Sequence, residues 1–197
     1  MDRFDDDFDA MDEDGYLTGQ LLIAMPGMDD ERFAQSVIYI CGHNSEGAMG
    51  LVVNRVLDSI TFPDLLEQLE ITPPGIAEPI SVHFGGPVEA GRGFVLHTAE
   101  YAQETTTMVN SRVALTATVD ILRDMARGRG PRQSLLALGY AGWGPGQLDQ
   151  EIKDNGWLNV QADEDLLFDH DLESKWERAI TKIGVDPRML TGVAGHA

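Results

Sequence analysis

The sequence predicts an α/β protein built on a mixed β-sheet flanked by helices. About eight runs of β-branched and aromatic residues alternate along the chain with about four segments whose apolar residues recur at helical spacing. Hydrophobic residues make up 43% of the 197 residues and prolines number only 9, which is typical of a globular protein with a sizeable core. This length suits one domain, so we expect a single domain over residues 16–197 after a disordered acidic leader, residues 1–15.

The first strands follow the leader directly. The segment GQLLIAMPGM indicates a strand over Gln20–Met25 that ends at the Pro-Gly pair. Ser36–Cys41 and Ala48–Asn54 are rich in β-branched residues and are separated by the turn-forming GHNSEG. These two runs therefore predict a β-hairpin.

A short helix comes next. Thr61 is a good N-cap residue, and Leu65, Leu66 and Leu69 form one apolar face. Pro73 follows, and the residue before a proline disfavours helical backbone, so the helix is expected to end before it.

Four more strands surround the next glycine-rich turns. Pro79–Phe84 and Gly93–Thr98 flank the sequence GGPVEAGR, which predicts two neighbouring strands. Arg112–Thr116 is also strand-like. Ser134–Tyr140 is almost continuously apolar, which is typical of a central strand buried on both faces.

Three helices and one strand complete the domain. Helices are expected between Thr118 and Gly128, between Pro145 and Gly156, and from Leu172 to Ile183, each with apolar residues at helical spacing. Glycine stands at the end of each helical pattern, where left-handed backbone stops a helix. The segment WLNVQA is the last strand.

The charge of the chain disfavours generic binding to polyanions. The 33 acidic and 14 basic residues give a formal net charge of −19, and residues 1–14 hold −7 of it, which leaves −12 for the rest. The leader has neither a cationic start nor a long apolar run, and no stretch reaches the ~18 apolar residues of a spanning helix, so we expect a cytoplasmic protein without membrane contact. The single cysteine, Cys41, agrees with a reducing compartment and is expected to be a buried structural residue.

Motifs for phosphate, nucleophilic or metal chemistry are incomplete. Gly42 and Gly47 have the spacing of a Walker A loop, but Ala48 and Met49 replace its Lys and Ser/Thr. GWGPGQLD lacks the third glycine of a dinucleotide fingerprint. The helix after it could receive an anion, but a tight turn that leads into a packed helix is the preferred explanation of its glycines. Ser45 is not in a G-x-S-x-G elbow, and no zinc or calcium motif is present. We expect no cofactor, no metal and no assignable catalytic residue.

Polar residues and glycines at predicted strand ends form the candidate binding site. His83 and His97 bracket a glycine-rich turn, so they are expected to lie within reach of each other, with Glu89 beside them. A cleft at strand ends is the usual ligand site in α/β sheets. The alternative is structural: each histidine bonds a backbone group and each glycine serves a turn. The candidate residues are Asn54, Arg55, His83, Gly85, Gly86, His97, Trp143, Gln147 and Glu151.

Four long segments resemble, in order and spacing, the bacterial YqgE/AlgH family. They are LLIAMPGMDDERFAQSVIYICGHNSEGAMGLVVNR, VHFGGPVEAGRGFVLH, LGYAGWGPGQLDQEIKDNGWL and LFDHDLESKWERAITKIGVDPRML, and the resemblance extends from Gly19 to Leu190. It implies an α/β fold with a mixed, partly barrel-like sheet and a small α+β lobe. It also implies a cytoplasmic protein of a family often labelled transcriptional regulators, with no settled activity and so no catalytic residue to carry over.

Direct reading of DNA is not expected from this chain. Its only basic cluster has a local net charge of +2 once neighbouring aspartates are counted, and arginines near a helix end also complement the helix dipole. A regulatory role would therefore be indirect, through a protein partner or a small ligand. The cluster comprises Arg123, Arg127, Arg129 and Arg132.

These observations predict a non-catalytic binding or regulatory protein, monomeric or weakly dimeric, with a protein or small-molecule partner. The alternative is an enzyme that acts on a small metabolite with a histidine acid or base. Such an enzyme should show a perturbed histidine beside Glu89 or another carboxylate in an enclosed pocket.

Overall fold

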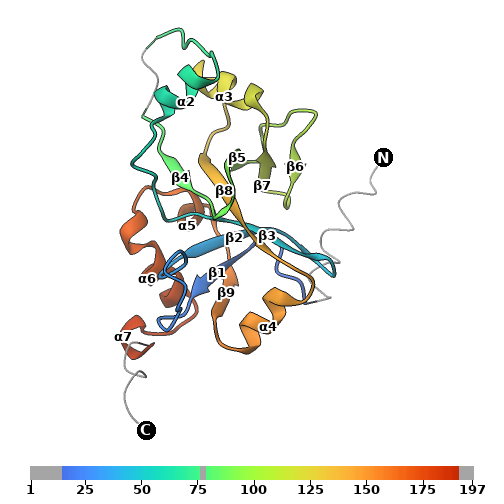
Figure 1. Cartoon of the computed structure of the whole chain (residues 1–197), viewed down its shortest axis with the longest axis vertical. Helices are drawn as coiled ribbons and strands as arrows, with labels where there is room; N and C mark the ends of the chain where they lie inside the picture. Colours follow the sequence, from blue (N-terminus) through green and yellow to red (C-terminus); the bar gives the residue numbers. More distant parts are fainter. Residues whose placement is uncertain (1–14, 76–78, 191–197) are drawn as a thin grey trace.

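One curled β-sheet organises the molecule in the computed structural model, which describes residues 15–75 and 79–190 (Figure 1). Apart from Gly15, the expected disordered leader lies outside the described residues. The sheet has nine strands, in the order β6-β7-β5-β8-β3-β2-β1-β9, with β4 paired to β8 off this path. The strands are β1 (Gln20–Ala24), β2 (Val37–Asn44), β3 (Gly47–Val52), β4 (Val82–Phe84), β5 (Val88–Thr98), β6 (Thr107–Met108), β7 (Val113–Thr116), β8 (Ser134–Trp143) and β9 (Trp157–Gln161).

Strand β8 is the central element, as its apolar run predicts. It pairs antiparallel with β5 and β3 and parallel with β4, and it runs from the end of the molecule with α2 and α3 towards α4 (Figure 1). The expected α/β fold with a mixed, partly barrel-like sheet is therefore confirmed. The predicted hairpin of β2 and β3 is also confirmed, with a register shift between Ile40 and Gly42.

The prediction that the strands of His83 and His97 are neighbours is wrong. Both β4 and β5 pair with β8, which lies between them. The glycine-rich segment between β4 and β5 therefore does not form a tight hairpin. Strand β8, which is distant in sequence and has a longer apolar run, is the partner of both β4 and β5.

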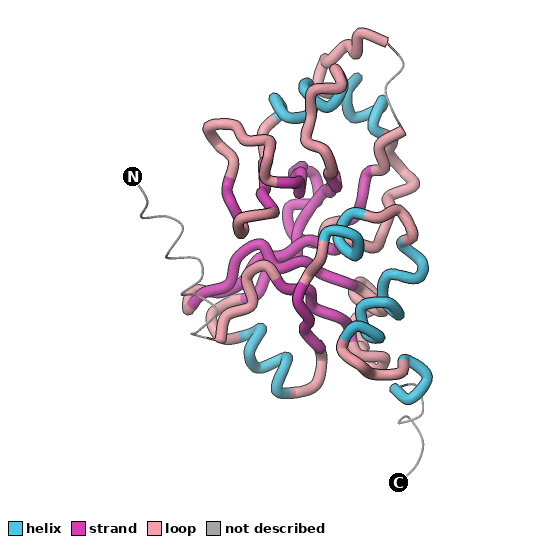
Figure 2. The backbone as a smooth tube through the Cα atoms, turned by 180° about the vertical axis from the view of Figure 1, so that it is seen from behind, coloured by secondary structure: helices cyan, strands magenta, loops and turns pink. Residues whose placement is uncertain are grey.

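Helices cover the sides and one end of the sheet (Figure 2). The structure confirms the four expected helices and adds two short ones, α5 and α7. Thr61 begins α2 through a capping box with Asp64, whereas the Thr118 hydroxyl before α3 donates to Gln103 Oε1 at 3.1 Å instead of capping its helix. The helices are α2 (Phe62–Gln68), α3 (Val119–Ala126), α4 (Gln147–Lys153), α5 (Glu164–Phe168), α6 (Leu172–Lys182) and α7 (Pro187–Leu190). None of the described helices is long and apolar enough to cross a membrane.

Apolar side chains fill both faces of the sheet. Leu21 and Ile23 of β1 belong to a core cluster shared with Trp176 of α6, while the alternating Leu22 belongs to a second cluster that contains Trp143. This alternation is the two-residue period of a strand buried on both sides. A third cluster joins α2 and α3 to β4, β5 and β8, and we call this part of the molecule the lobe.

Candidate functional site

The nine candidate residues occupy several separate places in the fold. Asn54 and Arg55 follow the end of β3 by two and three residues and hold the loop before β2. The Asn54 amide donates to the Gln35 carbonyl at 2.9 Å, and the Arg55 guanidinium donates to the carbonyls of Arg32 and Ala34, the latter at 2.7 Å. Their hydrogen bonds fix the local backbone.

Gly85 and Gly86 let the backbone after β4 approach β8 closely. A Cβ atom at Gly85 would lie 2.2 Å from the Gly139 carbonyl oxygen, and one at Gly86 would lie 2.0 Å from the Tyr140 carbonyl carbon. No Cβ tolerates such contacts with backbone atoms, so both positions require glycine for packing.

Both candidate histidines are buried and bonded to the protein. His83 is 8% exposed, and its Nδ1 donates to the Leu136 carbonyl at 3.0 Å. His97 is fully buried, with Nδ1 donating to the Thr98 carbonyl at 2.9 Å and Nε2 2.8 Å from the Thr116 hydroxyl. Burial lowers the pKa of each imidazole, which favours the neutral form.

Glu89 does not join the histidines. Its side chain is exposed and accepts a hydrogen bond from Arg92 at 3.4 Å. Within the described part of the chain, neither His83 nor His97 has a hydrogen bond to a carboxylate. His83 and His97 thus lack the carboxylate expected beside a histidine acid or base, whereas the buried His43 has its Nε2 3.7 Å from the Asp149 carboxylate.

The remaining three candidates lie around the start of α4. Gln147 is exposed, and its Oε1 accepts the Gly144 N–H at 3.0 Å. Trp143 is buried edge-on to Trp157, with ring centroids 6.2 Å apart. Burial raises the pKa of Glu151, and the indoles of these two tryptophans oppose that rise. Two of the three residues therefore sit in a packed cluster, and Gln147 alone faces solvent.

One hollow is an open trough of about 950 Å³ on the sheet, which we call the groove. It lies between β3 and β8 on one side and β5, β6 and β7 on the other. Trp143 is one of its walls, and the guanidinium of Arg92 lies 5.1 Å from the ring centre of Phe94. Its apolar surface comes mainly from Met49, Val88, Phe94, Leu115 and Tyr140.

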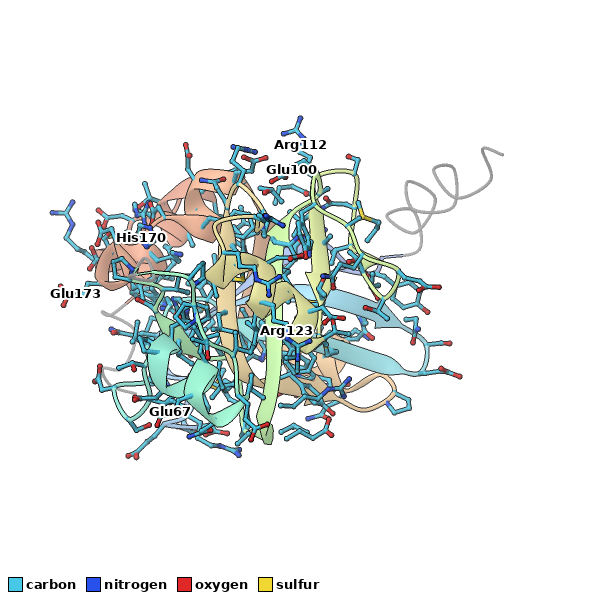
Figure 3. The ribbon with its side chains drawn as sticks, turned by 90° about the horizontal axis from the view of Figure 1, so that it is seen from above. Glu67, Glu100, Arg112, Arg123, His170 and Glu173 are labelled. Atoms are coloured by element: carbon cyan, nitrogen blue, oxygen red, sulfur yellow. The ribbon has the colours of Figure 1, made fainter. Side chains whose placement is uncertain are left out.

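A second hollow, of about 740 Å³, lies where the lobe meets α5 and α6, and we call it the junction pocket. Segments that are distant in sequence form it: residues 74 and 75, the chain that leads into β4, the end of α3 with the loop to β8, and the turn between α5 and α6. Figure 3 labels His170 on this turn and Arg123 on α3. The basic residues that line the pocket are His83, Arg127, Arg132 and His170.

Sequence reasoning missed a buried lysine behind the junction pocket. Lys175 of α6 is fully buried, and its ammonium donates to the carbonyls of Leu167, Asp169 and Val53 at 3.2, 3.3 and 3.4 Å. Burial lowers its pKa to about 8. The helical spacing could have predicted its burial, because Lys175 lies four residues before Ala179 and therefore on the same, buried face of the helix.

The Cys41 thiol is poorly suited to act as a nucleophile. Cys41 packs against the first core cluster, and burial raises its pKa to about 12, which disfavours the reactive thiolate. Among residues 15–75 and 79–190, no group of three or more His, Cys, Asp or Glu side chains is placed to hold a metal.

These features define a class of α/β proteins in which one long strand joins a curled sheet to a helical lobe. Comparison with known proteins then gives the family. The model of the AlgH-like family matches residues 21–188, and the chain belongs to this family.

Similar proteins cover almost the whole chain. A UPF0301 protein of Rhodopseudomonas palustris (strain HaA2) is 56% identical over 95% of this chain and 89% of its own length. A UPF0301 protein of Rhodospirillum rubrum is 54% identical over 93% of this chain and 96% of its own length.

Two solved structures share the fold. The AlgH protein of Pseudomonas aeruginosa matches with a TM-score of 0.76 and 42% identity, covering 92% of this chain and 96% of that one. A protein of Corynebacterium diphtheriae matches with a TM-score of 0.72 at 21% identity, over 88% of this chain and 91% of that one. The latter likeness concerns the fold alone.

Proposed function

We propose that this protein is a non-catalytic regulatory protein whose groove binds an extended segment of a protein partner. The observation that carries this proposal is the groove itself, an open trough of about 950 Å³ with an apolar floor. Contiguous exposed apolar surface is typical of sites that bind protein partners or ligands.

The edge of the sheet favours an extended partner. Strand β6 is the last in the sheet order and pairs only with β7 among the described strands. Thr105 and Thr107, next to or within β6, line the groove. An extended segment lying in the groove could therefore use unpaired backbone groups of an edge strand, as in β-augmentation.

Charge complementarity specifies the chemistry of that segment. Glu46 lines the groove and is exposed, and Glu89 beside Val88 is also exposed. The one cation in the lining, Arg92, is paired with Glu89. An apolar segment flanked by lysine or arginine fits this rim and the −12 charge of the chain beyond the leader.

A regulatory role through protein contact also agrees with the arginine cluster. Arg123 pairs with Asp120 at 2.7 Å and Arg132 pairs with Glu164 at 3.1 Å, so only part of the cluster is open to phosphates. We therefore keep direct DNA binding and membrane contact out of the proposal, and we place the protein in the cytoplasm. We leave the enzyme alternative out of the proposal, because His83 and His97 bond backbone or hydroxyl groups.

Peptide selection tests the proposal. A displayed library of random dodecapeptides is selected against the full chain, and enriched sequences are expected to combine apolar residues with basic flanks. Val88→Asp places a charge in the groove and should weaken binding of the synthetic peptide by ~10-fold or more. Val56→Asp is the matched control, since Val56 is 41% exposed and lies outside the groove, whereas Val88 is 37% exposed. Equal loss in both variants, or enrichment of acidic peptides, would contradict the proposal.

A further inference from the structure

We propose that the junction pocket is a second binding site, separate from the groove, for a small metabolite that carries an oxyanion and a hydroxyl group. Its volume of about 740 Å³ is within the range of metabolite sites and exceeds the needs of an inorganic ion. The pocket gathers basic side chains in a chain whose net charge is −19.

The acidic groups near the pocket are occupied. Asp169 is the carboxylate in the lining, and it receives both terminal nitrogens of Arg178, one of them at 2.7 Å. Glu164 accepts from Arg132 at 3.1 Å. Arg127 lines the pocket and makes no salt bridge in the part of the chain that the structure describes. Its guanidinium is therefore available to bind a phosphate or carboxylate in a bidentate manner.

The loop that carries the two arginines is held in place before any ligand arrives. The Arg129 N–H donates to the Asp124 carbonyl at 2.8 Å, and the Arg132 N–H donates to the Glu100 carboxylate. The Gln133 N–H donates to the Thr98 hydroxyl at 3.1 Å. A loop fixed at three points loses little conformational freedom on binding, which favours affinity.

Buried charge adds to the positive potential of the pocket. The Lys175 ammonium lies behind the wall, bonded to the carbonyls of Leu167 and Asp169, with no carboxylate within salt-bridge distance among the described residues. Burial is the main cause of the low pKa of His83, and the charges of Lys175 and His170 lower it further. Lys175 and His170 thus lie close enough to His83 to disfavour its protonation, and the Lys175 charge that does so would attract an anion.

An unpaired amide specifies the second part of the ligand. The Gln133 Oε1 atom is buried and has no hydrogen-bond partner in the described structure, and Gln133 lines the pocket. A buried acceptor without a donor costs free energy, and a turn of the Gln133 side chain towards the pocket would let a ligand hydroxyl recover it. The ligand class is therefore a phosphate or carboxylate derivative of a hydroxylated metabolite.

Titration of the full chain with four probes tests this site. Glucose 6-phosphate, gluconate, glucose and inorganic phosphate are compared by isothermal titration calorimetry and thermal shift at neutral pH. Glucose 6-phosphate or gluconate should bind and raise Tm, and which of the two binds better distinguishes phosphate from carboxylate. Glucose should not bind, and inorganic phosphate should bind more weakly because it has no sugar hydroxyl for Gln133.

Two arginine variants locate the site. Arg127 is exposed, so Arg127→Ala should fold normally and weaken binding of the sugar anion by ~10-fold or more. Arg92→Ala, in the groove, is the matched control and should bind as the native chain does. The proposal is overturned if neither sugar anion binds at millimolar concentration, if glucose binds equally well, or if Arg127→Ala has no effect.

Discussion

The groove and the junction pocket lie on the same sheet and differ in what builds them. The groove is the exposed part of strands whose alternating apolar residues continue into the core, and its floor contains few charges. The junction pocket is made mainly by loops and helix ends, and its basic side chains come from β4, the loop between α3 and β8, and the turn between α5 and α6. The regular strands therefore form a surface suited to apolar contacts. The surface between the lobe and helices α5 and α6 is instead suited to charged ligands.

The largest expected effect concerns the close contact between the residue after β4 and strand β8. Gly85→Ala should cost about 3 kcal/mol or more of unfolding free energy, because its Cβ would lie 2.2 Å from a backbone oxygen of β8. Gly91→Ala is the control, since a Cβ there meets nothing within 4 Å. Urea denaturation compares the two, and equal stability would show that β4 does not need its close approach to β8.

The buried lysine behind the junction pocket should make stability depend on alkaline pH. The pKa of Lys175 is lowered from 10.5 to about 8, so between these values only the unfolded chain keeps the proton. Raising the pH through this window should therefore stabilise the native chain by about 3 kcal/mol relative to Lys175→Met. Urea denaturation at pH 7, 8, 9 and 10 of both chains measures the difference. Parallel pH profiles would show that the amine is not desolvated.

A smaller effect separates a buried candidate from an exposed one. His97→Ala removes the imidazole donor to the Thr98 carbonyl and one of the two partners of the buried Thr116 hydroxyl, and should cost roughly 1 to 3 kcal/mol. Gln147→Ala removes an exposed hydrogen bond to Gly144 and should change stability by only about 0.5 kcal/mol. Urea denaturation measures the free energy of unfolding of both variants. A large decrease for Gln147→Ala would mean that Gln147 stabilises the fold at the start of α4.

Local patterns made much of the fold predictable. The β2–β3 hairpin, the central strand β8 and helix α2 follow from alternation, a continuous apolar run and a capping residue, all of which act between near neighbours in sequence. The pairing of β4 and β5 with β8 was not predictable this way. Strand partners depend on the whole topology, and the sequence shows only that two strands flank a glycine-rich segment.

The sites were less accessible to sequence reasoning. Of the candidate residues, His83 lines the junction pocket and Trp143 lines the groove, while Asn54 and Gly86 serve local packing or hydrogen bonding. Lys175 was missed because lysine is rarely buried without a carboxylate. Arg127 was considered only as one member of a basic cluster, whose net charge argued against DNA binding. Its value as a ligand-binding residue depends on which arginines of the cluster form ion pairs in the fold.

The central claim is that two independent binding sites occupy this fold. The direct test is to measure both ligands, the selected basic peptide and the sugar anion, on both Val88→Asp and Arg127→Ala. We expect Val88→Asp to lose peptide binding and keep the sugar anion, and Arg127→Ala to show the reverse. Loss of both ligands in either variant, with the fold intact by circular dichroism, would contradict the separation of the groove from the junction pocket.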